Sequence, residues 1–198
     1  MLIFLAAILA GLAAGIIRAR SGKYKYDPAQ LQGVWLVLLA FILQFLVFNF
    51  PPTSSHASRE IISGTLIFSQ LPLFLFAWLN RRRTGFWLLG LGLTLNFLVI
   101  TLNGGLMPIS PELVSRLLPD ASPGFWQIGE RLGTGKDVVL QINQTNLYFL
   151  SDQFTLPDWI PYRVAFSLGD IVIAFGTFWL LWFLGSPQNH QNKLEQKS

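Results

Sequence analysis

The chain has 198 residues, of which 52% are hydrophobic and only 12% are charged. Charged residues normally make up about a quarter of a soluble domain, so this composition and its long apolar runs predict an integral membrane protein. The absence of cysteine excludes disulfides, thiolate metal sites and cysteine nucleophiles, and no other metal or cofactor site is predicted. The net charge of +4 does not indicate nucleic-acid binding, because the basic residues cluster beside hydrophobic runs.

Five apolar segments approach or reach the roughly 20 helical residues that cross a bilayer. They cover residues 1–17, 31–50, 61–79, 85–102 and 166–185. Pro72 lies inside the third segment and is expected to kink its helix, because proline has no backbone donor. The sequence therefore predicts an all-α transmembrane bundle of about five spans, which forms a single integral membrane domain over residues 1–198.

The basic residues predict the orientation of this bundle. An excess of lysine and arginine in short loops marks the cytoplasmic side of a membrane. The N-terminus is therefore expected outside and the C-terminus inside, with residues 186–198 as a disordered cytoplasmic tail. This arrangement places nine basic residues inside: Arg18, Arg20, Lys23, Lys25, Arg81, Arg82, Arg83, Lys193 and Lys197. The other five are spread over longer outer stretches.

Residues 103–163 form the longest polar stretch and are predicted to be an insertion outside the membrane. The stretch opens with Asn103, Gly104 and Gly105, where the glycines favour a tight turn at the exit of the fourth span. Ser110 before a proline is typical of a helix cap, so a short amphipathic helix is expected through Leu118, lying at the membrane interface.

Two short β-type runs follow in this insertion, at residues 138–142 and 146–150, with a polar turn between them. This pattern predicts a β-hairpin on the outer surface. The preceding segment from Gly133 to Lys136 is similar in sequence to part of a phosphate-binding loop. However, Asp137 occupies the position where that motif requires serine or threonine. A phosphate-binding loop is therefore not predicted.

Asp170 is the one charged residue in the apolar run 164–185. A carboxylate at the centre of a bilayer costs roughly 2.5–3.5 kcal/mol on insertion scales, so Asp170 is expected to face protein or water. Two interpretations stay open. Asp170 is a catalytic, proton-carrying or ligand-binding carboxylate, or it is a buried residue that bonds its helix neighbours or caps a helix that begins near Ser167.

Amide side chains also recur within the spans, at Gln44, Gln70 and Asn96. They are consistent with a polar cluster in the outer half of the bundle, and equally with hydrogen bonds between helices, worth roughly 0.6 kcal/mol each. Asn96 and Asn103 are seven residues apart and share a helix face. The sequence therefore predicts a polar site in the outer half of the bundle. Its members are Asp170, Asp152, Asn96, Asn103, Gly104, Gly105 and Ser167.

The second half of the chain resembles a bacterial membrane family of unknown function, the domain of unknown function family 5317. Three stretches carry the resemblance: residues 103–108, residues 147–152, and residues 166–170 with Ile173 and Gly176. The resemblance implies a multipass protein of the bacterial cytoplasmic membrane and carries no known activity.

The start of the last span also resembles, more distantly, signal peptidase II, a membrane-embedded aspartyl peptidase. Phe166 and Asp170 fit its Phe-Asn-x-Ala-Asp motif, with Ser167 and Gly169 in place of the Asn and Ala. The resemblance implies that Asp152 is the second member of a catalytic pair. Such a pair activates water when one carboxyl is protonated. Asp170 is expected to carry the raised pKa, with Asp152 ionised nearer water.

A third hypothesis is a binding or scaffold protein. The interfacial helix, the hairpin and the outer polar cluster would then form a shallow site for a lipid head group or a partner helix. The expected partners are membrane lipids and, on the peptidase hypothesis, a membrane-embedded peptide or protein.

Overall fold

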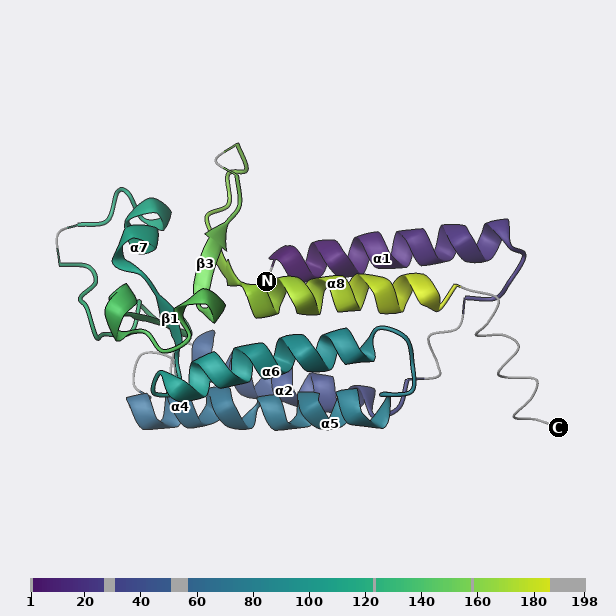
Figure 1. The fold of residues 1–198 in the computed structure, drawn as a ribbon, viewed down its shortest axis with the longest axis horizontal. Helices are drawn as coiled ribbons and strands as arrows, with labels where there is room; N and C mark the ends of the chain where they lie inside the picture. Colours follow the sequence, from purple (N-terminus) through teal and green to yellow (C-terminus); the bar gives the residue numbers. More distant parts are fainter. Residues whose placement is uncertain (1, 27–30, 51–56, 123, 158, 186–198) are drawn as a thin grey trace.

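The computed structural model describes residues 2–26, 31–50, 57–122, 124–157 and 159–185. Roughly parallel helices occupy one part of the molecule, and a small sheet with one short helix caps one end of them (Figure 1). The predicted tail at residues 186–198 lies outside the described residues. The long helical elements are α1 (Leu2–Ser21), α2 (Val34–Phe48), α4 (Arg59–Phe68), α5 (Gln70–Leu79), α6 (Phe86–Leu102) and α8 (Leu168–Phe183).

Each predicted apolar span contains one of these helices or, in the third span, two. The described residues include two helical runs that are long and apolar enough to cross a membrane, Ile3–Ser21 and Arg59–Leu79. The second run is interrupted at Ser69, between α4 and α5. Pro72 lies one turn beyond this break and cannot donate to the carbonyl of Phe68. The break therefore agrees with the predicted disturbance of the third span.

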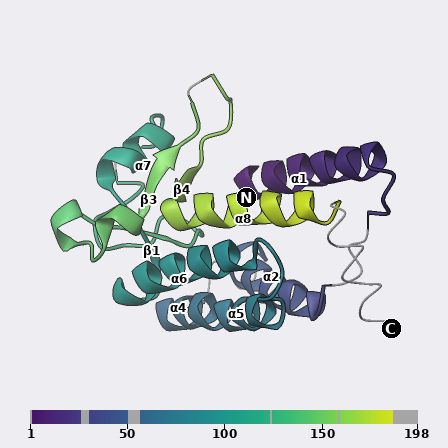
Figure 2. The ribbon, with the colours of Figure 1, turned by 45° about the vertical axis from the view of Figure 1, so that its right-hand side comes forward.

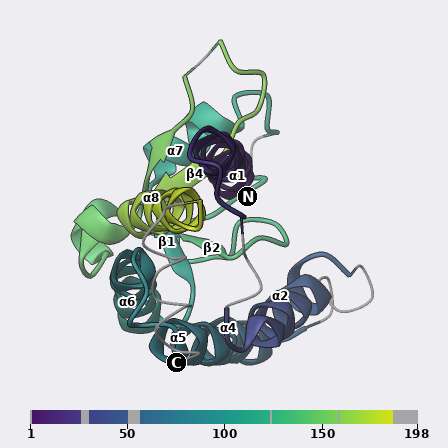
Figure 3. The ribbon, with the colours of Figure 1, turned by 90° about the vertical axis from the view of Figure 1, so that its right-hand side faces the viewer.

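The helices pack in an order that differs from their order in the sequence. α1 packs against α8, α8 against α6, α6 against α5, and α5 against α2. Seen along the helices, they follow an arc with α1 at one end and α2 at the other (Figure 3). The first and last helices of the chain are therefore neighbours.

Small residues allow α8 to approach both of its neighbours closely. A Cβ atom on Gly15 of α1 would lie 2.4 Å from the carbonyl oxygen of Leu181. On the other side, a Cβ on Gly92 of α6 would lie 2.7 Å from the carbonyl oxygen of Gly169. Separations this short exclude any side chain, so these glycines set the distance between the helices.

The sheet has four strands in the order β2-β1-β3-β4. Its strands are β1 (Met107–Ile109), β2 (Asp137–Val139), β3 (Asp152–Thr155) and β4 (Ala165–Ser167). β1 runs parallel to both β2 and β3, whereas β3 and β4 are antiparallel. The fold is therefore mostly helical with a small mixed sheet, and the all-α prediction is corrected to that extent.

The hairpin predicted over residues 138–150 is wrong. Only Asp137–Val139 forms a strand there, and two 3₁₀ turns follow at Ile142–Gln144 and Tyr148–Leu150. The reason is burial on both faces. Val138 packs in the cluster that contains Val99, and Val139 packs in the cluster that contains Val114. A strand with two buried faces needs a partner from the interior, which β1 supplies. The antiparallel pair of the sheet is β3 and β4 instead.

The short helix predicted after Ser110 is confirmed as α7 (Pro111–Leu117). The Ser110 hydroxyl accepts a hydrogen bond from the Leu113 amide at 3.3 Å, which caps the helix as predicted. Val114 is fully buried and holds α7 against the sheet.

Candidate functional site

Strand β4 leads directly into α8 (Figure 2). Asp170 lies in the first turn of that helix. The Ser167 hydroxyl accepts a hydrogen bond from the Asp170 amide at 3.0 Å, and the Asp170 carboxylate accepts one from the Ser167 amide at 3.2 Å. This reciprocal pair is a capping box. The interpretation of Asp170 as the cap of a helix that begins near Ser167 is therefore confirmed.

Asn96 of α6 completes the network around this helix start. Its amide nitrogen donates to the second oxygen of Asp170 at 2.8 Å, and its carbonyl oxygen accepts from the Ser167 hydroxyl at 2.9 Å. The close approach of α6 and α8 at Gly92 and Gly169 brings these side chains within reach. The structure thus unites three predicted site residues, Asn96, Ser167 and Asp170, in a network that also joins two helices.

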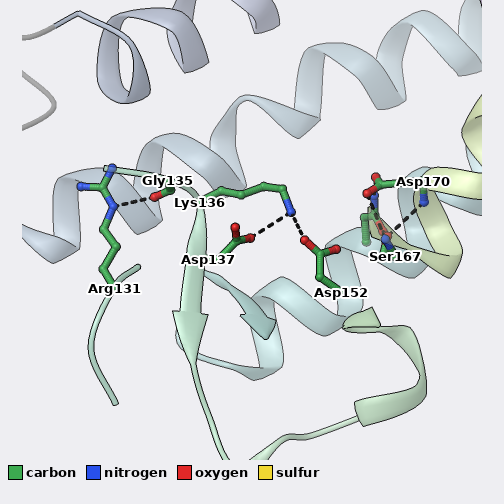
Figure 4. Close-up of polar contacts among 8 residues, drawn as sticks. Arg131, Gly135, Lys136, Asp137, Asp152, Ser167 and Asp170 are labelled. Carbon is green, nitrogen blue, oxygen red and sulfur yellow. Dashed lines mark hydrogen bonds and ion pairs between the residues drawn. The ribbon is translucent and has the colours of Figure 1, made fainter. Parts of the chain in front are cut away.

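Asp152 lies at the start of β3, directly opposite Ser167 in the antiparallel pair. Its side chain is only 1% exposed. One carboxylate oxygen is 2.6 Å from the ammonium nitrogen of Lys136, and the other oxygen is buried without a hydrogen-bond partner among the described residues. Figure 4 shows Asp152 between Lys136 and the pair formed by Ser167 and Asp170.

Lys136 is the principal residue of the site that the sequence reasoning did not select. Its ammonium group contacts Asp137 at 3.1 Å as well as Asp152. The turn before it is held by Arg131, whose guanidinium donates to the carbonyl oxygen of Gly135 (Figure 4) and also to that of Thr134. The sequence feature that could have identified Lys136 is the charged pair Lys136-Asp137, which immediately precedes two valines that are buried in the structure.

The charges in this cluster shift one another's pKa values. Burial raises the pKa of the Asp152 carboxyl to about 7, and the Lys136 ammonium opposes this rise without cancelling it. Burial alone would lower the pKa of Lys136, but the carboxylates of Asp137, Asp152 and Asp170 outweigh it and hold that pKa above its ordinary value. The prediction gave Asp152 the solvated, ionised role. The structure instead makes Asp152 the buried carboxyl with a raised pKa.

Asn103, Gly104 and Gly105 lie away from this network. The Asn103 amide donates to the carbonyl oxygens of Val99 at 2.7 Å and Asn146 at 2.9 Å, so it ties the end of α6 to the loop before β3. The carbonyl oxygen of Gly104 accepts from Ser63 at 3.1 Å. Gly105 has a φ of 82° and faces Ser63 so closely that a Cβ would lie 2.5 Å away. These residues shape the end of the bundle, and the structure does not place them in the site.

A cavity of about 480 Å³ adjoins the network. Its size falls within the range of ligand pockets, roughly 300–1,000 Å³. Lys136, Asp137, Asn96 and Asp170 line one part of it, whereas Asp152 does not line it. Apolar side chains from several helices line the remainder, including Leu66, Leu73, Leu93, Ile100 and Ile173. The arrangement offers charged and polar groups next to an apolar wall.

The fold and site define a mostly helical protein with apolar helices, a small capping sheet and a buried ion pair beside a cavity. A family model described as a family of unknown function, DUF5317, matches residues 28–182, and the chain belongs to this family. It is also similar to an uncharacterised protein of Thermotoga maritima, with 27% identity over 192 residues that cover 94% of this chain and 90% of the relative. No solved structure matches the chain.

Proposed function

We propose that this is an integral membrane protein with five spans, formed by α1, α2, the α4–α5 run, α6 and α8. Large apolar side chains on the outside of the helices support the proposal. Trp35, Phe68 and Trp87 are 63%, 66% and 75% exposed, and many leucine and phenylalanine side chains accompany them. Exposed apolar surface on this scale is unusual for a soluble monomer and is expected where lipid covers the helices.

In the proposed orientation, the sheet and the site lie outside and the turn between α5 and α6 lies inside. The chain contains no cysteine, so single cysteines report the topology without background. Ser122→Cys should react with an impermeant maleimide in intact cells, and Thr84→Cys should react only after permeabilisation. The reverse pattern would contradict the orientation, and reaction of both in intact cells would contradict the spans.

The cavity is proposed to bind an amphipathic molecule. The observation that supports this function is the lining of the cavity, with charged and polar groups along one part of it and apolar groups along the rest. The ammonium of Lys136 has three donors and already contacts the carboxylates of Asp137 and Asp152. Arg163, the other cation of the lining, is exposed to solvent, where a charge attracts an anion only weakly. Asp170 retains further acceptor capacity, because a carboxylate offers about four lone-pair sites. The site therefore favours a head group that donates hydrogen bonds, such as hydroxyls or an amine, over a phosphate.

Binding can be measured with amphiphiles that share one alkyl chain and differ in head group: a glycoside, an amine and a phosphate. Brominated chains quench tryptophan fluorescence and report the affinity. The glycoside or the amine should bind most tightly, and Asp170→Asn should weaken that binding about tenfold, the effect of one charged hydrogen bond. Asp120→Asn, in the exposed loop after α7, is the matched control. Tightest binding of the phosphate, or no effect of Asp170→Asn, would refute the proposal.

A second candidate is an aspartyl hydrolase, and the pKa of about 7 for Asp152 beside Asp170 is the observation that favours it. Asp170 would take a proton from water as the oxygen attacks an amide carbonyl, and protonated Asp152 would give its proton to the carbonyl oxygen. Asp170 would then give its proton to the amide nitrogen as the C–N bond breaks, and ionised Asp152 would take a proton back from a hydroxyl of the diol. An amine and an acid are released, and both carboxyls return to their starting states. Entry of substrate to Asp152 requires Lys136 to move, because Asp152 does not line the cavity.

The hydrolase candidate is tested in liposomes with transmembrane peptides and oxygen-18 water. New carboxyl termini that carry the heavy oxygen should form with the unaltered protein and disappear with Asp152→Asn and with Asp170→Asn. Tight binding without turnover would leave the binding function and exclude the hydrolase.

A further inference from the structure

Gln70, the first residue of α5, lies inside the helical arc with its hydrogen-bonding capacity unused. It is 4% exposed, and neither its amide nitrogen nor its amide oxygen has a hydrogen-bond partner among the described residues. A buried polar group without a partner costs about 1–3 kcal/mol. The neighbouring amides differ, because Gln44 donates to Ser69 at 2.9 Å and Asn96 bonds Asp170. Hydrogen bonding between helices therefore explains Gln44 and Asn96 but not Gln70.

Gln70 lines the same cavity as Asp170 and lies at a similar level of the bundle. The hydrogen bond of Ser63 to Gly104 aligns α4 with the end of α6. Gln70 follows Ser63 by seven residues, and Asn96 precedes Asn103 by seven. At a rise of 1.5 Å per residue, Gln70 and Asn96 each lie roughly 10 Å along the helices from the contact between Ser63 and Gly104. The unpaired amide is thus placed where a molecule that reaches Asp170 would pass.

We propose that Gln70 is a recognition residue for a peptide-like group in the bound amphiphile. This inference rests on the proposed binding function of the cavity. A carboxamide presents one donor and one acceptor side by side. In an extended peptide, the N–H and C=O of one residue also point to the same side, which is how strands pair. Gln70 can therefore bond both groups of one amino-acid residue at once and satisfy both of its buried atoms.

An N-acylated amino acid and an extended membrane peptide both carry this chemistry. The first probe is an N-acylglycine methylamide with an alkyl chain, compared with its depsi analogue, in which an ester oxygen replaces the glycine N–H. The unaltered protein should bind the amide roughly tenfold more tightly, because the ester leaves a buried acceptor unpaired. In Gln70→Leu the two affinities should agree within about twofold. A peptide of transmembrane length forms a third arm, and its tighter binding would identify a peptide as the source.

Gln44→Leu is the matched control, because Gln44 lines the cavity but is already bonded to Ser69. It should keep the preference for the amide. Equal binding of the amide and the ester to the unaltered protein would refute the role of Gln70 but leave the proposed binding function standing. If neither compound binds, the proposed binding function itself is refuted. Stability gives an independent reading. Gln70→Leu without ligand should be at least as stable as the unaltered protein, since an unpaired buried group is removed, and a clear loss of stability would also overturn the proposal.

Discussion

Lys136→Met isolates the contribution of the buried ion pair. It removes the cation that contacts Asp152 at 2.6 Å and keeps most of the length of the side chain. Removing one partner of a buried pair costs about 3–5 kcal/mol. The Lys136 side chain remains 36% exposed whereas Asp152 is 1% exposed, so the lower end of that range applies, about 3 kcal/mol.

The cost should depend on pH, because the pKa of Asp152 is about 7 in the folded protein. At about pH 5 the carboxyl is protonated with or without Lys136. The substitution then removes a hydrogen bond to Asp152 worth about 1 kcal/mol and the contact with Asp137, which is lost at every pH. At about pH 9 the unaltered protein keeps an ionised, paired Asp152, whereas the variant must bury that charge unpaired or take up a proton. The destabilisation should therefore grow as the pH rises through about 7.

The assay is reversible unfolding in mixed micelles, followed by tryptophan fluorescence at several pH values. Asp137→Asn is the comparison, because Asp137 is 21% exposed and contacts the same ammonium group at 3.1 Å. Its effect should be smaller and should not grow through pH 7. A loss of stability in Lys136→Met that is the same at acid and alkaline pH would refute the coupling to Asp152.

Three further predictions concern the site and its supports. Gly92→Ala should destabilise the protein by about 1–3 kcal/mol through overpacking, whereas Gly90→Ala on the same helix, with open space around it, should be neutral or slightly stabilising in the same unfolding assay. Ser167→Ala should cost about 1–2 kcal/mol through loss of the helix cap, and a Thr replacement should restore most of it. The pKa of Asp152, raised from 3.8 to about 7, means that its contribution to stability is largest below about pH 4 and is lost as the pH rises to about 7. Infrared difference spectra should show its protonated carboxyl band disappearing near pH 7, and persistence of that band change in Asp152→Asn would contradict the assignment.

Local signals predicted much of the helical part of this protein. The apolar runs match the helices α1, α2, α6 and α8, and Ser110 marks the start of α7. Asn96 and Asp170 were selected because they are polar groups within apolar spans, and such groups are costly unless they are paired. Ser167 was selected as the possible start of the last helix and by its place in the motif of the last span. These features depend on residues that are near neighbours in the chain, so the sequence alone was sufficient.

Only the tertiary structure decided the sheet and the ion pair. β1 pairs in parallel with β2, where Met107 lies opposite Asp137 across a long connection, and no local pattern encodes such a register. The pairing of β3 with β4 then places Asp152 opposite Ser167, and the turn held by Arg131 delivers Lys136 to Asp152. Burial raised the pKa of the Asp152 carboxyl. Desolvation depends on what surrounds a group in space, which is why the sequence could select the carboxylates but could not assign their states.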